Sequence, residues 1–128
     1  MRNSIGVMQG RLLPKYQDRY QAHPVGYWQD EFIVAREIGL DCIEFILDYN
    51  DTEENPLIKD GGIDVIKAVI ERTGVSVKTI CADYFMEAPL HSENIEMANS
   101  SQKLMISLLN NTAELGVTDV VIPCVDQS

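Results

Sequence analysis

Short runs of apolar and β-branched residues alternate along the chain with longer segments in which apolar residues recur every three or four positions. The short runs predict strands, and the longer segments predict helices that turn one face toward a core. Ser92 is the candidate N-cap of the last helix, and Glu31 lies in the first turn of the first helix, where the helix dipole favours an acid. We expect strands over 4–9, 42–48, 76–83 and 119–125, and helices over 27–38, 62–73 and 92–115.

An internal repeat supports these elements. Gly39, Gly74 and Gly116 each follow a predicted helix, and each precedes an apolar residue, one or two polar residues and a β-branched run. A glycine in the left-handed conformation can close a helix, so each repeat predicts a tight loop that leads into a buried strand. Strands that alternate with helices in this way indicate parallel pairing through right-handed crossovers.

Two architectures fit this order, an open doubly wound sheet and the first half of a (βα)8 barrel. A dinucleotide-binding sheet places a glycine-rich turn directly after its first strand, whereas Gln9-Gly10-Arg11 here leads into about 15 polar and aromatic residues. Long segments after strands and tight returns before them are typical of barrels. We therefore expect an α/β fold of parallel βα units, with about four strands and three helices, in which residues 1–128 form one domain that is the N-terminal half of a TIM barrel.

A half-barrel leaves strand edges and an apolar face exposed. The sequence therefore favours a fragment of a longer protein, and the alternative is a pair of copies that complete the core together.

Composition narrows the classes of partner. Twenty acidic and ten basic side chains give a formal net charge of −10, which disfavours nucleic acid. No apolar run approaches the length of a membrane span, and the N-terminus lacks the apolar core of a signal peptide, so we expect no membrane partner and a cytoplasmic location. Cys42, Cys81 and Cys124 are odd in number and far apart, so buried thiols are expected rather than disulfides or a metal knuckle.

Polar residues gather where the predicted strands end. The carboxyl ends of parallel strands share one rim, which is where α/β folds bind ligands. Carboxylates at such a rim suit a divalent cation, a general base or hydrogen bonds to sugar hydroxyls, although aspartates also cap ordinary loops. The candidate substrate-binding residues are Gln9, Arg11, Glu44, Asp48, Asp83, Tyr84 and Asp126.

Some of these candidates carry a more specific expectation. Glu44 interrupts an apolar strand and should point into the barrel interior toward partners, because burying a lone carboxylate is costly. Arg11 could pair with a carboxylate or hold a substrate phosphate or carboxylate through its fork of donors. Tyr84 could form a wall beside a sugar or pack within its loop. His23 and His91 lie in predicted loops, without metal-ligand spacing, and are expected at the surface.

Several segments together resemble sugar phosphate isomerase/epimerase-like proteins of the xylose-isomerase-like TIM-barrel superfamily. The resemblance covers nearly the whole chain and implies a (βα)8 barrel, a carbohydrate substrate and a divalent metal ion such as Mn, Mg, Co or Zn. It implies aldose–ketose isomerisation, or epimerisation next to a carbonyl. The segments are Ile5-Gly6-Val7-Met8-Gln9-Gly10-Arg11-Leu12, Trp28-Gln29-Asp30-Glu31-Phe32, Ile43-Glu44-Phe45-Ile46-Leu47-Asp48, Cys81-Ala82-Asp83-Tyr84-Phe85-Met86 and Ile122-Pro123-Cys124-Val125-Asp126.

The resemblance also limits what this chain can do alone. In the metal-dependent epimerases of the superfamily, the metal ligands come from strands 5 to 8, so residues 1–128 would supply substrate-side walls, hold no metal alone and be inactive without the second half. Gln9 and Arg11 would orient the substrate. A DNA-repair branch places histidines on strands 2 and 3, and Asp48 and Asp83 at those strand ends disfavour it.

Two further alternatives stay open. The first is a non-catalytic half-barrel that forms a homodimer through its exposed edges. The second is a lyase that works through a Schiff base, for which Lys78 is the only strand-borne lysine and lies far from the rim.

Overall fold

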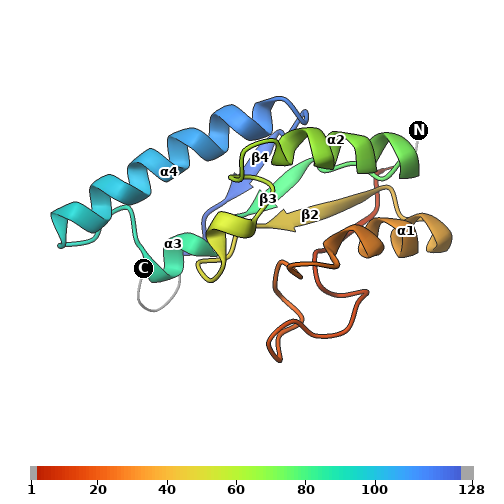
Figure 1. The fold of residues 1–128 in the computed structure, drawn as a ribbon, viewed down its shortest axis with the longest axis horizontal. Helices are drawn as coiled ribbons and strands as arrows, with labels where there is room; N and C mark the ends of the chain where they lie inside the picture. Colours follow the sequence, from red (N-terminus) through yellow and green to blue (C-terminus); the bar gives the residue numbers. More distant parts are fainter. Residues whose placement is uncertain (1–2, 125–128) are drawn as a thin grey trace.

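The computed structural model in Figure 1 describes residues 3–124 and contains four strands and three long helices in the predicted order. Two short helices, at Tyr84–Glu87 and Thr52–Glu54, were not predicted. The strands are β1 (Gly6–Met8), β2 (Cys42–Ile46), β3 (Thr79–Cys81) and β4 (Asp119–Val121), and the helices are α1 (Trp28–Ile38), η1 (Thr52–Glu54, a 3-10 helix), α2 (Gly62–Thr73), α3 (Tyr84–Glu87) and α4 (Ile95–Ala113).

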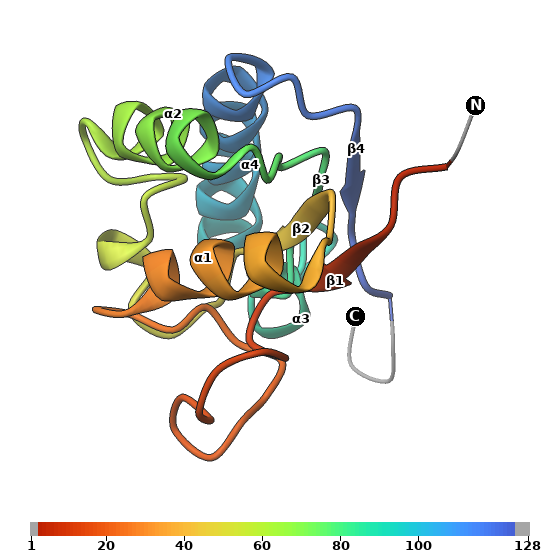
Figure 2. The ribbon, with the colours of Figure 1, turned by 90° about the vertical axis from the view of Figure 1, so that its right-hand side faces the viewer.

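The sheet is entirely parallel, and its strands lie in the order β1-β2-β3-β4. A doubly wound sheet reverses its strand order at a switch point, and the described strands contain no such reversal. Successive crossovers of one hand place their helices on one face of a sheet. Figure 2 shows α1, α2 and α4 on one side of the sheet and no helix on the other. The α/β prediction is confirmed, and the arrangement is compatible with half of a (βα) barrel.

The core lies between β2 and the helices. Ile43 and Phe45 alternate along β2 with the half-buried Glu44, and both apolar side chains are fully buried on the helix side. The Phe45 ring lies 6.3 Å from the ring of Phe32 and 5.5 Å from that of Trp28, both from α1. Burial of each such aromatic side chain stabilises the fold by roughly 2 kcal/mol, so β2 is firmly held and fixes the position of the residues that follow it.

The predicted glycine-led returns are confirmed. Gly39, Gly74 and Gly116 have φ angles of +86°, +75° and +79°, and the first two are the C-caps of α1 and α2. Gly39 and Gly74 therefore close α1 and α2 as the repeat predicted, whereas α4 ends at Ala113 with Glu114 as its C-cap, and Gly116 lies in the turn that follows. The longer connections lie at the carboxyl ends of the strands.

Several predicted boundaries are wrong by a few residues. The α4 helix begins at Ile95 rather than at Ser92, because the Asn94 side chain caps it by accepting a hydrogen bond from the Met97 N–H (3.2 Å). Ser92 instead accepts from the Asn94 N–H in the preceding turn (3.1 Å). The strands are shorter than the predicted 4–9, 42–48, 76–83 and 119–125, and the end of the last range lies outside the described residues. No helix in residues 3–124 is both long enough and apolar enough to cross a membrane.

Candidate functional site

The loop between β1 and α1, residues 9–27, lies beside the carboxyl end of the sheet (Figure 1). Gly10 has a φ angle of +93°, and a β-carbon there would lie 1.9 Å from the Tyr20 carbonyl oxygen and 2.8 Å from that of Ala22. Only glycine combines this φ angle with so close an approach of two backbone segments. Gly10 therefore allows the far part of the loop to return to the end of β1.

A buried carboxylate anchors this loop. Glu31 of α1 is fully buried and accepts hydrogen bonds from the Gly10 N–H (2.8 and 2.9 Å to its two oxygens) and from the Leu12 N–H (3.0 Å). Burial raises the pKa of the Glu31 carboxyl, and the backbone N–H donors oppose that rise. The first-turn acid thus does more than complement the helix dipole, because it fixes the loop to α1.

His23, in the same loop, is buried, so the prediction of a surface histidine is wrong. Its ring lies 5.2 Å from the ring of Phe45 and 6.1 Å from that of Trp28, and its Nδ1 lies 3.3 Å from Oε1 of Gln9. That oxygen also accepts from the Ile46 N–H (2.9 Å). Because an amide oxygen can only accept, the contact with Gln9 requires a proton on Nδ1. Burial lowers the pKa of His23 to about 3, so the ring is neutral at ordinary pH.

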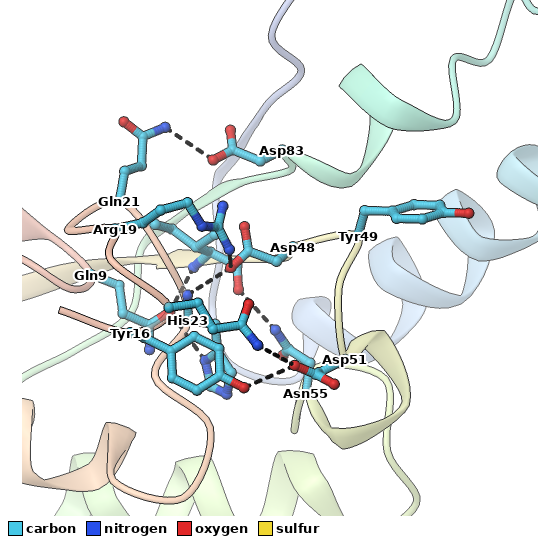
Figure 3. A network of polar contacts seen from close by, with 12 residues as sticks. Gln9, Tyr16, Arg19, Gln21, His23, Asp48, Tyr49, Asp51, Asn55 and Asp83 are labelled. Atoms are coloured by element: carbon cyan, nitrogen blue, oxygen red, sulfur yellow. Dashed lines mark hydrogen bonds and ion pairs between the residues drawn. The ribbon is translucent and has the colours of Figure 1, made fainter.

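Asp48, which follows β2, receives two groups from the loop (Figure 3). Its Oδ2 accepts from the His23 backbone N–H (2.8 Å) and contacts Nη2 of Arg19 (3.4 Å). The carboxylate is almost fully buried, and burial raises its pKa against the opposing effects of the His23 N–H and the Arg19 charge. The nearby charge of Asp83 raises it further. The end of β2 thus holds a carboxylate that the loop partly neutralises.

Asp83, which follows β3, is bound by the same loop. Its Oδ2 accepts from Nε2 of Gln21 (2.9 Å), and its Oδ1 accepts from the Cys81 thiol (3.2 Å). Burial and the adjacent Asp83 raise the pKa of Cys81 to about 12, so this thiol stays protonated. Arg19, Gln21 and His23 therefore join one loop to the ends of two neighbouring strands.

A cavity of about 270 Å³ opens between these strand ends and α3. This volume suits a small polar molecule rather than a drug-sized one. Tyr49 extends away from the Arg19–Asp48 pair in Figure 3, and its ring lies 5.2 Å from that of Tyr84. The cavity is lined by Arg19, Asp48, Tyr49, Asn50, Asp83, Met86 and Glu87.

The structure brings Asp48 and Asp83 together, as expected for a shared rim, but separates them from Glu44. Glu44 lies on the face without helices, where its Oε2 accepts from the Thr79 hydroxyl (2.7 Å). It lines a different hollow of about 260 Å³ beside β1 and β2. Glu44 thus has the partner expected of an inward-pointing carboxylate, but it lies outside the cavity between the two aspartates.

The remaining predicted residues have different positions. Gln9 is fully buried and connects β1 to β2 and His23. Arg11 is exposed, and its Nη2 donates to Oε1 of Gln21 (3.3 Å). Tyr84 is half-buried, and its ring packs against that of Tyr49. Asp126 lies outside the described residues.

The residues that sequence reasoning missed come chiefly from the loop. Arg19 and Gln21 reach the aspartates through their side chains, whereas His23 reaches Asp48 through its backbone N–H and its ring is buried. Residues 20–22 form bends, so no strand-like alternation marks this segment in the sequence. Tyr49 directly follows Asp48, so proximity in sequence alone could have nominated it.

The donor set does not fit a metal ion. Among residues 3–124, no group of three or more His, Cys, Asp or Glu side chains could hold one. Asp48 and Asp83 already accept hydrogen bonds from the loop, and Arg19 adds a positive charge beside them. The arrangement can instead accept hydrogen bonds from hydroxyl groups and donate them through a guanidinium.

Comparison with known proteins identifies no family for the chain: no family model matches it, and no curated protein sequence matches it.

Proposed function

We propose that this chain binds a carbohydrate in the cavity between Asp48 and Asp83, as the substrate-binding part of a sugar or sugar-phosphate isomerase or epimerase. The observation that carries the proposal is the pair of buried carboxylates at adjacent strand ends. The β1–α1 loop reaches them with two donors, the Arg19 guanidinium at Asp48 and the Gln21 amide at Asp83. The sequence resemblance to sugar phosphate isomerase/epimerase-like proteins supports the same class of ligand.

Each group has a chemical role in this proposal. Asp48 and Asp83 accept hydrogen bonds from hydroxyls on neighbouring carbons, and a charged acceptor strengthens each bond. Arg19 donates to a ring or carbonyl oxygen. Tyr49 lines the cavity, is 47 % exposed and packs against the ring of Tyr84, and it offers an amphipathic wall to the less polar side of a sugar.

The metal that the resemblance implies would need ligands other than the described residues. Asp48 and Asp83 serve in this proposal as acceptors for substrate hydroxyls, and no bond-making step is assigned to them. The chemical step would belong to the rest of the barrel.

The proposal is tested by ligand-observed NMR and calorimetry with a panel of ketoses and aldoses and their phosphates. Asp83→Asn should weaken binding by about tenfold or more, because it removes a charged acceptor. Asp119→Asn is the matched control, since Asp119 is exposed at the opposite end of the sheet. Binding of no sugar by the native protein, or equal weakening by both substitutions, would contradict the proposal.

A second candidate function is self-association without catalysis, which the exposed apolar surface beside β4 favours. A groove of about 440 Å³ runs between α4 and β4, with Met105, Leu109 and Val120 among its lining residues. β1 and β4 are the edges of the described sheet, so a second copy could continue it in parallel by placing its β1 beside β4. Sedimentation over a range of micromolar concentrations tests this candidate, and a monomer throughout would exclude it.

A further inference from the structure

We infer that the cavity between Asp48 and Asp83 selects uncharged sugars and rejects phosphorylated ones. This inference rests on the proposed carbohydrate binding and narrows it to one substrate class. It is carried by the formal charges around the cavity and by the contact that already engages its one positive group, Arg19.

The lining of the cavity is formally negative. Asp48, Asp83 and Glu87 contribute three acids, and Arg19 is the only base among the described lining residues. Three negative charges and one positive charge leave a formal charge of −2. A phosphate dianion in this cavity would therefore meet a net charge of its own sign.

The one positive group is also partly engaged. Nη2 of Arg19 contacts Oδ2 of Asp48 at 3.4 Å, so a phosphate at the guanidinium would share its charge with a buried carboxylate. Two other cations of the loop are directed elsewhere. Arg11 donates to Gln21, and Lys15 lies 4.9 Å from the centre of the Tyr20 ring.

The first amides of α3 give a phosphate no alternative cradle beside the cavity. The first N–H groups of α3 are already hydrogen-bonded within the chain, with Tyr84 donating to Leu47 (2.8 Å) and Met86 donating to Asp83 (3.0 Å). Phosphate sites at helix ends depend on unpaired N–H groups that point at the ligand, and these amides are occupied. Neutral hydroxyls, in contrast, find charged acceptors on two sides.

The size of the discrimination follows from Coulomb's law. A pair of unit charges a few ångströms apart at a partly exposed site changes an affinity by about tenfold, and the effect is screened by salt. We therefore expect a sugar phosphate to bind at least about tenfold more weakly than its parent sugar at low ionic strength. The difference in affinity between the sugar and its phosphate should decrease as salt is added.

The experiment is isothermal titration of the native chain with D-fructose and D-fructose 6-phosphate, and with D-xylulose and D-xylulose 5-phosphate, at low and high salt. A chelator in the buffer prevents divalent cations from masking the phosphate charge. Glu87→Gln should narrow the gap between each sugar and its phosphate, because it removes one negative charge from the lining. Glu71→Gln is the control, since it removes the same charge from the exposed end of α2 near Thr73.

The possible results separate the selection against phosphates from the proposed binding of carbohydrates. A sugar phosphate that binds as tightly as its parent sugar overturns the inference and leaves carbohydrate binding standing. A gap that salt and Glu87→Gln leave unchanged also overturns it, because discrimination would then come from shape. If no sugar of either kind binds, the proposed function fails and this inference fails with it.

Discussion

The burial of His23 makes the stability of the protein depend on pH in a way that one substitution can isolate. The unfolded chain takes up a proton on this ring near the ordinary pKa of 6.5, whereas the folded protein does so only near 3. Between these values the unfolded state holds more protons. The free energy of unfolding contributed by His23 is therefore fully present above the unfolded pKa and is lost as the pH falls through the window below it.

The expected magnitude follows from this shift. Proton uptake by the unfolded state alone costs about 1.4 kcal/mol of stability for each pH unit below the unfolded pKa, so stability falls by about 2 kcal/mol between about pH 7.5 and pH 5. His23→Asn retains a nitrogen donor at the position of Nδ1 toward Gln9 but cannot titrate. The variant is expected to be less stable at neutral pH, because the ring contacts with Phe45 and Trp28 are lost. It should also lack the part of the pH dependence of unfolding free energy that comes from His23.

The assay is urea unfolding of both proteins at several pH values, followed by tryptophan fluorescence. Glu31 and Asp48, whose pKa values burial raises, change stability in the opposite direction with pH, so the quantity to read is the difference between variant and native protein. His91→Asn is the control, because His91 is exposed. If the native protein and His23→Asn lose stability equally on acidification, the reasoning about His23 is refuted.

Two other predictions concern the β1–α1 loop and are read from urea unfolding at neutral pH. Glu31→Ala should lower the free energy of unfolding by about 3 kcal/mol or more, because it leaves the Gly10 and Leu12 N–H groups buried without their acceptor. Glu37→Ala, on the exposed side of α1, should lower it by less than about 0.5 kcal/mol. Similar losses for the two variants would contradict the role of Glu31 as the anchor of the loop. Gly10→Ala should lower the free energy of unfolding by several kcal/mol more than Gly26→Ala. Both glycines have positive φ angles, but a β-carbon at Gly26 meets no atom within 4 Å. Equal losses would show that the close approach at Gly10 is relieved easily.

The order of elements was predictable because each signal is local. Apolar periodicity predicted the helices, and Gly39 and Gly74 were correctly interpreted as the ends of α1 and α2 without knowledge of their surroundings. Gly116 has the predicted left-handed conformation but lies beyond Glu114, the C-cap of α4. The exact ends of the helices were harder to predict. Ser92 and Asn94 are both good N-caps, and only the packing of α4 decides between them.

The candidate site was predictable only where it depends on strand ends. Asp48 and Asp83 were found because parallel strands bring their carboxyl ends to one rim. Glu44 and Gln9 were assigned to the same rim, but their side chains lead to the face without helices and to the interior. How far a residue lies from the carboxyl rim of the sheet cannot be read from one sequence, because this distance depends on the register between neighbouring strands.

The loop residues were missed for a different reason. Arg19 and His23 lie in a segment without periodicity long enough to analyse, and a loop histidine is ordinarily exposed. Its burial results from contacts with Gln9 and Phe45, which precede or follow it by 14 and 22 positions. Such contacts are created by the tertiary fold and leave no local mark in the sequence.

The β1–α1 loop links three successive βα units. Near its start, the loop donates to Glu31 of the first unit. Near its end, it donates to Asp48 of the second unit and Asp83 of the third. Repeating βα proteins can in principle open one unit at a time, but here the release of this loop would disturb three units at once. The loop and the ends of β2 and β3 should therefore open as one cooperative unit, and amide exchange in these segments should share one opening free energy.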